Sequence, residues 1–107
     1  MASYQVLVYD NNHYRDESER TDYGVFPSAE EAIAKSKWII DNDLTWMWMP
    51  GMSAADLYQL YICWGPDPVV VPLNPSDPEV AFSAWPYAKE RCREIIIDPA
   101  LANAKKH

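Results

Sequence analysis

The chain has 107 residues, of which 49% are hydrophobic and 23% charged, and it carries a formal net charge of -7 at pH 7. This size and composition are typical of a single globular domain, residues 1–107, and they exclude a disordered chain. The negative charge repels nucleic-acid phosphates and anionic lipids at long range, so we expect no nucleic-acid partner and no membrane partner.

The compartment is predicted from two further observations. The N-terminal residues lack the basic segment and apolar core of a secretory signal, and no apolar run approaches the roughly 18 residues that cross a bilayer. Cys63 and Cys92 are far apart and form no C-x-x-C pair, which favours reduced, buried thiols over a disulfide or a zinc site. We therefore expect a cytoplasmic protein.

The first predicted element is a strand over residues 4–9, in which β-branched and aromatic side chains alternate between two faces. Both faces are apolar, so this strand should be central in its sheet. A second, short strand is predicted over residues 23–26. The connection through residues 10–22 makes the two strands antiparallel.

Capping patterns predict the first two helices. Ser28 and Glu31 form a capping box, so a helix should begin at Ala29, and it should end near residue 42 or 43. Ser53 is the N-cap of a second helix that ends at Gly65. The predicted apolar face of this second helix consists of Leu57, Leu60, Tyr61 and Trp64.

A third strand and a third helix follow. Three valines at residues 69–71 lie between prolines and have the composition of a buried or edge strand. Ser83 can cap a helix whose inward stripe contains Trp85, Ala88 and Cys92, while residues 95–97 either continue this helix or form a strand. The predicted class is therefore α+β, a small antiparallel sheet (an N-terminal hairpin plus a short third strand) with about three helices packed on it.

Several kinds of site are excluded by the residue inventory. The three glycines are too scattered for a glycine-rich nucleotide-binding loop, and no cofactor is predicted. A calcium loop that starts at Asp10 would place Tyr14, Arg15 and Thr21 where an oxygen ligand, a glycine and a glutamate are required. The histidine and carboxylates of the same segment lack the spacing of a zinc site, so no metal is predicted.

Residues 9–24, YDNNHYRDESERTDYG, concentrate polar chemistry between the two predicted N-terminal strands. One interpretation is a solvated hairpin connection whose charges protect a sheet edge. The other is a binding surface built from Asp10, His13, Tyr14 and Arg15, in which the histidine titrates near neutrality. The segment holds five carboxylates and two arginines, a charge of -3, and would prefer a cationic or hydrogen-bonding partner.

Residues 45–49, TWMWM, are the second candidate, because Trp46 and Trp48 alternate with methionines and bring a large apolar surface. These tryptophans either close the core between two helices or form a dimer or partner contact. Trp64 and Trp85 are assigned to the core, and Tyr58 is assigned to the surface.

Two functional hypotheses remain. The first is a non-catalytic domain that binds another protein or itself, which rests on the acidic surface, the missing catalytic patterns and TWMWM. The alternative is a small enzyme that uses His13 as general acid or base, with nearby carboxylates such as Asp10 and with Arg91 from the third helix. Arg91 also interleaves with glutamates, as do Lys89 and Arg93, which predicts a polar helix face for all three.

Five segments of the chain, DNNHYRDESER, GVFPSAEEAI, SAADLYQLY, WGPDPVVVP and FSAWPYAKERCREI, together resemble a family of small bacterial proteins of unknown function. The shared order is D-N-x-H-Y, a capped helix with E-E-A-I, L-Y-x-x-Y, G-x-D-P and F-S-A-W-x-Y-A-x-x-R-C, over most of residues 8–95. The resemblance implies membership and no activity. It marks Asp10, Asn11, His13, Tyr14, Phe82, Ser83, Trp85, Tyr87, Arg91 and Cys92.

Overall fold

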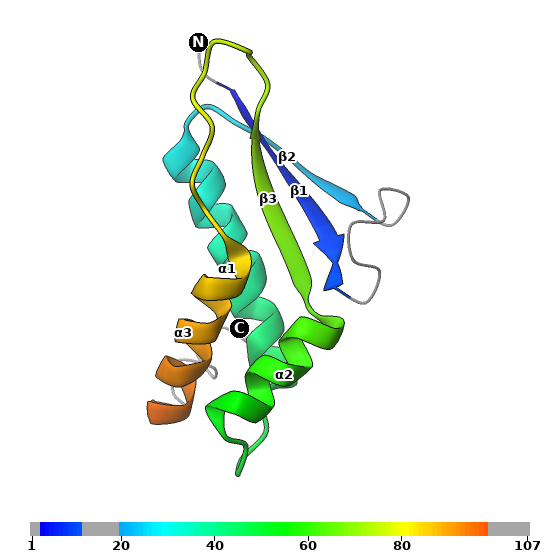
Figure 1. Ribbon diagram of the computed structural model, residues 1–107, viewed down its shortest axis with the longest axis vertical. Helices are drawn as coiled ribbons and strands as arrows, with labels where there is room; N and C mark the ends of the chain where they lie inside the picture. The colour runs from blue at the N-terminus through cyan, green and yellow to red at the C-terminus, as the bar shows by residue number, and fades with distance from the viewer. Residues whose placement is uncertain (1–2, 12–19, 99–107) are drawn as a thin grey trace.

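A computed structural model describes residues 3–11 and 20–98 of the chain. Figure 1 shows the elements of this part in the order β–β–α–α–β–α. They are β1 (Tyr4–Asp10), β2 (Thr21–Phe26), α1 (Ala29–Met47), α2 (Ala54–Trp64), β3 (Pro66–Pro72) and α3 (Ala84–Ile97). The predicted α+β class, a small antiparallel sheet with helices packed on it, is confirmed.

The sheet has the strand order β2-β1-β3, and both pairings are antiparallel. The prediction that β1 is central is confirmed. Three prolines, Pro66, Pro68 and Pro72, lie on β3, which is longer than the predicted valine strand. They are an even number of residues apart, so their missing amides fall on one side of the strand. An edge strand tolerates this because one side has no neighbour.

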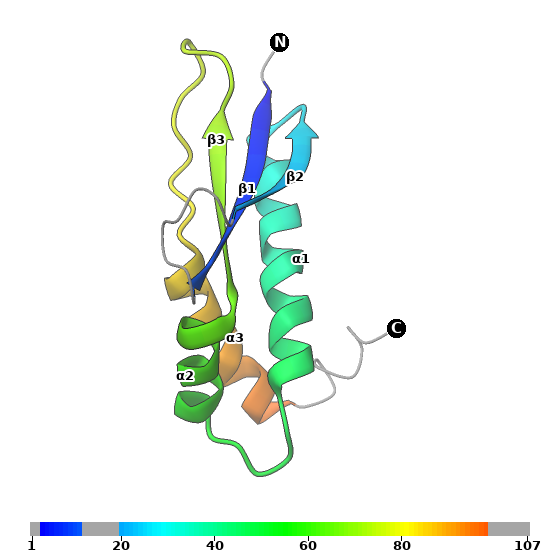
Figure 2. The ribbon, with the colours of Figure 1, turned by 90° about the vertical axis from the view of Figure 1, so that its right-hand side faces the viewer.

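The helix α1 covers one face of the sheet, as Figure 2 shows. The alternation in β1 places Tyr4, Val6 and Val8 on this face, where they form a cluster with Ile39 of α1 and Val70 of β3. The remaining residues of β1 between them point to the opposite face and are only half-buried. The two apolar faces of β1 therefore differ in the structure: α1 covers one face, and the other is only half-buried.

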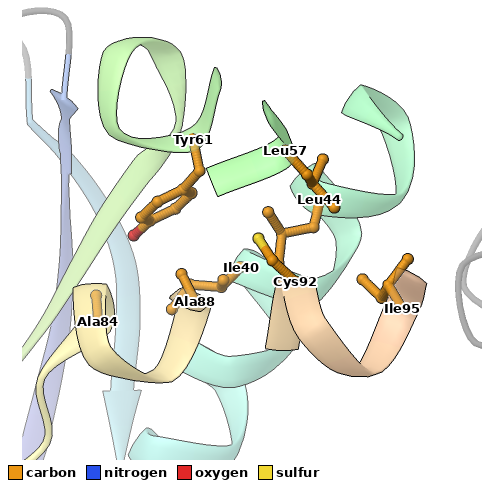
Figure 3. Packing of buried hydrophobic residues seen from close by; sticks show 8 residues of the cluster. All are labelled: Ile40, Leu44, Leu57, Tyr61, Ala84, Ala88, Cys92 and Ile95. Atoms are coloured by element: carbon orange, nitrogen blue, oxygen red, sulfur yellow. The ribbon is translucent and has the colours of Figure 1, made fainter. Parts of the chain in front are cut away.

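A second cluster joins the C-terminal half of α1 to α2 and α3 (Figure 3). Its buried residues are Ile40, Leu44, Leu57, Tyr61, Ala84, Ala88, Cys92 and Ile95. Part of each predicted apolar stripe contributes to this cluster, such as Leu57 and Tyr61 of α2 and Ala88 and Cys92 of α3. Because α1 contributes side chains to both clusters, it connects the sheet to the helical end of the molecule.

Two predictions about helix ends need correction, and the alternative left open for residues 95–97 is settled. The helix α1 does not end near residue 42 or 43 but continues to Met47, because Leu44 still packs in the helical cluster. Residues 95–97 are helical and not a strand, since Ile95 is buried in the same cluster. Ser83 stands at the N-cap of α3 but makes no capping hydrogen bond with its side chain.

The predicted burial of three side chains, those of Trp64, Tyr58 and Cys63, was wrong, whereas Cys92 is buried as predicted. Trp64 was assigned to the core, but it lies at the C-terminal end of α2 and is 62% exposed. Tyr58 was assigned to the surface, but it is half-buried and its ring stacks against Tyr61 at 6.3 Å between centroids. Cys63 is exposed while Cys92 is buried, and both are free thiols.

Among the described helices, none is long and apolar enough to cross a membrane.

Candidate functional site

The residues predicted to form a site lie in three places. His13, Tyr14 and Arg15 fall outside the described residues. Asp10 ends β1, and Trp46 and Trp48 lie at and just beyond the last turn of α1. Trp85 and Arg91 belong to α3, at its first turn and its middle. The described residues among them have separate contacts, and Asp10 lines a pocket.

A pocket of about 230 Å³ lies where the end of β1 meets α1 and the junction between α2 and β3. Antiparallel pairing sets Asp10 opposite Pro66, directly after the end of α2, and this brings Asp10 and Trp64 to one opening. Asp43 reaches the pocket from α1. The full lining is Val8, Tyr9, Asp10, Thr21, Asp43, Trp64, Gly65 and Pro66.

Asp43 is the most perturbed carboxyl group of the described residues. Burial and, to a smaller extent, the negative charge of Asp10 together raise the pKa of Asp43 from 3.8 to about 6. Its Oδ2 atom is buried, and no donor among the described residues reaches it. A buried carboxylate oxygen without a partner is costly, so the pocket favours a proton or a cationic donor at this position.

The wall of the pocket at Gly65 is tightly constrained. A Cβ atom added there would lie 2.5 Å from Cδ1 of Tyr61 and 2.8 Å from its carbonyl oxygen, so the position requires glycine. The amide of Gly65 donates to that same oxygen at 2.7 Å, and the hydroxyl of Tyr61 donates to the carbonyl of Pro66 at 2.6 Å. Burial raises the pKa of Tyr61 above its ordinary value, so it stays a neutral donor.

Asn11 joins β1 to two helices just beyond the pocket. Its backbone amide donates to the Gly65 carbonyl at 2.9 Å, and its side-chain Nδ2 donates to the Tyr61 carbonyl at 2.9 Å. Its Oδ1 accepts a hydrogen bond from Nε1 of Trp85 at 3.1 Å. Asn11 is buried, so these bonds hold the end of β1 against α2 and α3. Trp85 is thus partly buried and hydrogen-bonded, beside the helical cluster to which it was assigned.

Arg91 is bound between helices and not on a polar surface as predicted. Its Nε donates to Oδ1 of Asp41 at 3.0 Å, and the hydroxyl of Tyr87 donates to the same oxygen at 2.8 Å. Its Nη1 lies 3.2 Å from Glu94. Asp41 is buried. The pKa of Tyr87 is raised first by the burial of Tyr87 itself and next by the hydrogen bond that its hydroxyl donates to Asp41. These contacts fasten α3 to α1, whereas Lys89 and Arg93 remain exposed.

The TWMWM residues divide between the two alternatives that the sequence left open. Trp48 is half-buried and packs against the helical cluster, as the core interpretation predicts. Trp46 is 70% exposed and Met49 is 63% exposed, which suits a contact surface. Trp46 follows Asp43 by three residues on α1, so the two side chains emerge next to each other on the helix.

Sequence reasoning identified Asp10 but missed Asp43 and Trp64. The signal for Asp43 is its spacing, because Ile39, Asp43 and Met47 follow at intervals of four on the inward side of α1. An acid on an apolar stripe indicates a buried carboxyl group. Trp64 shares the stripe of α2, and only the end of the helix at Gly65 shows that no neighbour covers it.

Comparisons of the chain with family models, with curated proteins and with solved structures gave no match. The resemblance to a small bacterial family therefore stays a prediction. Within residues 3–11 and 20–98, no three histidine, cysteine, aspartate or glutamate side chains gather in a way that could hold a metal ion. The ionisable and aromatic residues that line the pocket are Tyr9, Asp10, Asp43 and Trp64.

Proposed function

We propose that the protein is a non-catalytic protein-binding domain whose pocket receives a basic side chain of its partner. The observation that carries the proposal is the buried Oδ2 of Asp43, which lacks a donor from the described residues and shares a pocket with Asp10. An ammonium or guanidinium group would supply the donor and offset the repulsion between the two carboxylates.

The surroundings of the pocket suit a long basic side chain. Trp64 lines the opening and is 62% exposed, so its ring is available to the alkyl stem or the charged head of a lysine or arginine. Trp46, three residues after Asp43 on α1, adds exposed apolar area, and tryptophan is among the residue types that dominate binding energy at interfaces. The net charge of -7 attracts basic partners at long range.

The proposal is tested with a capped Gly-Lys-Gly peptide and the same peptide acetylated on its lysine. Acetylation removes the charge and keeps the stem. In NMR titrations the charged peptide should shift the amides of Asp10, Asp43 and Gly65, with a dissociation constant on the order of 1 mM for one side chain. Asp43→Asn should weaken binding about tenfold, the effect of one lost charge-assisted hydrogen bond.

The control is Glu79→Gln, which removes one exposed carboxylate outside the pocket and should leave the affinity unchanged. Equal binding of the acetylated peptide, or shifts confined to other parts of the chain, would contradict the proposal. The partner can also be a second copy of the chain. Light scattering separates these cases, because Trp46→Ser should lower the oligomeric mass only if the protein binds itself.

A second candidate is the small enzyme in which His13 acts as general acid or base. Its supporting observation is the pair of carboxyl groups, because Asp43 has a pKa near 6 beside Asp10, the residue that leads into the segment with His13. Arg91, which this hypothesis also used, is bound by Asp41 and Glu94. An NMR titration discriminates, because a catalytic His13 would titrate in steps coupled to Asp43.

A further inference from the structure

The pocket that contains Asp10 and Asp43, called the acidic pocket below, lies at the C-terminal end of α2. A second hollow, a groove, lies at the N-terminal end of the same helix. It occupies about 430 Å³ between the first half of α2 and the middle of α3, and Figure 2 shows these two helices side by side. Its lining is Ala54, Ala55, Tyr58, Gln59, Lys89 and Arg93. A space of this size lies within the range of small-molecule pockets and exceeds what a bare ion would fill.

The charges that line this groove are positive, although the protein carries -7 overall. Lys89 and Arg93 are four residues apart on α3, so both side chains project on the same side of the helix. Arg91 of the same helix does not line the groove, because it binds Asp41 of α1. Lys89 forms no ion pair with a described residue, and Arg93 has only an exposed contact of 3.6 Å with Glu90, which contributes little.

The α2 side of the groove adds apolar contact. Ala54 and Ala55 are the first two residues of α2, and their small side chains leave space beside the groove. The ring of Tyr58 is half-buried beside them and packs against the helical cluster. One wall is thus apolar and aromatic, and the other carries two cations.

We propose that the groove between α2 and α3 binds a small organic carboxylate with a flat apolar body. The carboxylate pairs with Lys89 and Arg93, and the body lies on the alanines and the ring of Tyr58. The two positive charges select against cations, and the apolar wall favours a ligand larger than inorganic phosphate. This site shares no lining residue with the acidic pocket. A test of this proposal is therefore independent of the test of the proposed function.

The test compares 4-phenylbutyrate, its neutral analogue 4-phenylbutan-1-ol and inorganic phosphate in NMR titrations of the full chain. Phenylbutyrate should shift the amides of Ala55, Gln59 and Arg93, and it should bind about tenfold more tightly than the alcohol, the effect of one charge-assisted pairing. Phosphate should bind more weakly than phenylbutyrate, because it makes no contact with the apolar wall.

Two variants separate loss of the site from loss of the fold. Lys89→Gln with Arg93→Gln should weaken phenylbutyrate binding about tenfold or more, since both charged partners are removed. Ala55→Glu should also abolish binding by repulsion, while an acid in the first turn of α2 is compatible with the helix dipole. The matched control is Lys35→Gln on α1, which lies over Trp38 away from the groove and should not change the affinity.

Equal affinities for phenylbutyrate and the alcohol would overturn the proposal, because the cations would then have no role. Binding that survives Ala55→Glu, or shifts centred on Asp43, would place the ligand elsewhere and overturn it as well. Absence of any shift at millimolar phenylbutyrate would show that the groove is not a carboxylate site.

Discussion

At the scale of single residues, Asp43 combines a functional opportunity with a cost in stability. Its pKa is raised from 3.8 to about 6 by burial and by Asp10, so the folded protein disfavours its charged form. A binding site commonly carries such strain, because the group that attracts a ligand is poorly compensated without it. The same carboxyl group should therefore weaken the fold and create the pocket's affinity for cations.

The pH dependence of stability follows from the direction of this shift. Between pH 3.8 and about 6 the folded protein retains a proton on Asp43 that the unfolded chain has already released. The free energy of unfolding should therefore fall as the pH rises through this window. With allowance for solvent screening, we expect a loss of about 1 to 2 kcal/mol. Urea denaturation of wild type and Asp43→Asn at pH 4 and pH 7 measures it.

The Asp43→Asn variant should be more stable than wild type at pH 7 by about 1 to 2 kcal/mol and nearly equal to it at pH 4. Glu79→Gln serves as the control, since its carboxyl group is exposed and its removal should leave the difference between the two pH values unchanged. A variant that is less stable than wild type at pH 7 would show that the Asp43 carboxylate is well compensated in the folded state.

At the scale of elements, α3 is attached to α1 by polar as well as apolar contacts. Asp41 is 6% exposed and accepts from both Arg91 and Tyr87, so one carboxylate of α1 satisfies two donors of α3. Removing one partner of a mostly buried ion pair leaves an uncompensated charge. The free-energy cost of that charge exceeds the stabilisation that the intact pair contributes. The contact thus fixes how α3 sits on α1.

Removal of the shared acceptor should loosen this contact. We expect Asp41→Ala to reduce the free energy of unfolding by about 2 to 3 kcal/mol, because Arg91 and Tyr87 keep their burial and lose their partner. Glu94→Gln removes only the exposed partner of Arg91 and should change it by less than about 0.5 kcal/mol. Urea denaturation compares the two. Similar small changes in both variants would mean that Asp41 contributes no more than a surface charge.

The sequence determined most of the elements but fewer of their ends. Alternation in β1 and the N-cap serines of α1 and α2 are local patterns, and these elements begin where the patterns predict. The end of α1 depends on Leu44 packing between α2 and α3, which no local pattern contains. Likewise, Trp64 lies on the apolar stripe of its helix, and its exposure follows only from where the neighbouring elements end.

The candidate site shows the same division. Asp10 was identified because it begins an unusually polar connection, whereas its neighbour Asp43 is 33 residues away in the sequence and reaches it only through the packing of α1 on the sheet. The contact between Asn11 and Trp85 spans 74 residues. Both residues belong to the resemblance, but the order of motifs along a chain does not state which of them touch.

At the scale of the whole molecule, the described part of the protein has two apolar clusters, one under the sheet and one between the helices. The helix α1 belongs to both. Asn11 forms a second link, because it ties the end of β1 to Tyr61 and Gly65 at the end of α2 and to Trp85 of α3. Cooperative unfolding of the two clusters should therefore depend on Asn11 as well as on α1.

This dependence gives the last prediction. Asn11→Ala keeps the backbone hydrogen bond to Gly65, but it removes the acceptor of Trp85 Nε1 and one of the two donors to the Tyr61 carbonyl, which retains the amide of Gly65. We expect the free energy of unfolding to fall by about 2 to 3 kcal/mol, because two buried or partly buried polar groups lose a hydrogen bond. Urea denaturation followed by tryptophan fluorescence and by far-ultraviolet circular dichroism measures both the loss and the coincidence of the two signals.

The control for this prediction is Asn42→Ala on α1, where the same side chain is removed from a half-exposed helical position and stability should change by less than about 0.5 kcal/mol. If Asn11 links the clusters, the fluorescence transition of Asn11→Ala should move to lower urea and precede the circular dichroism transition, since four of the five tryptophans, including Trp85, lie at the helical end. An unchanged midpoint would mean that α1 alone joins the sheet to the helices.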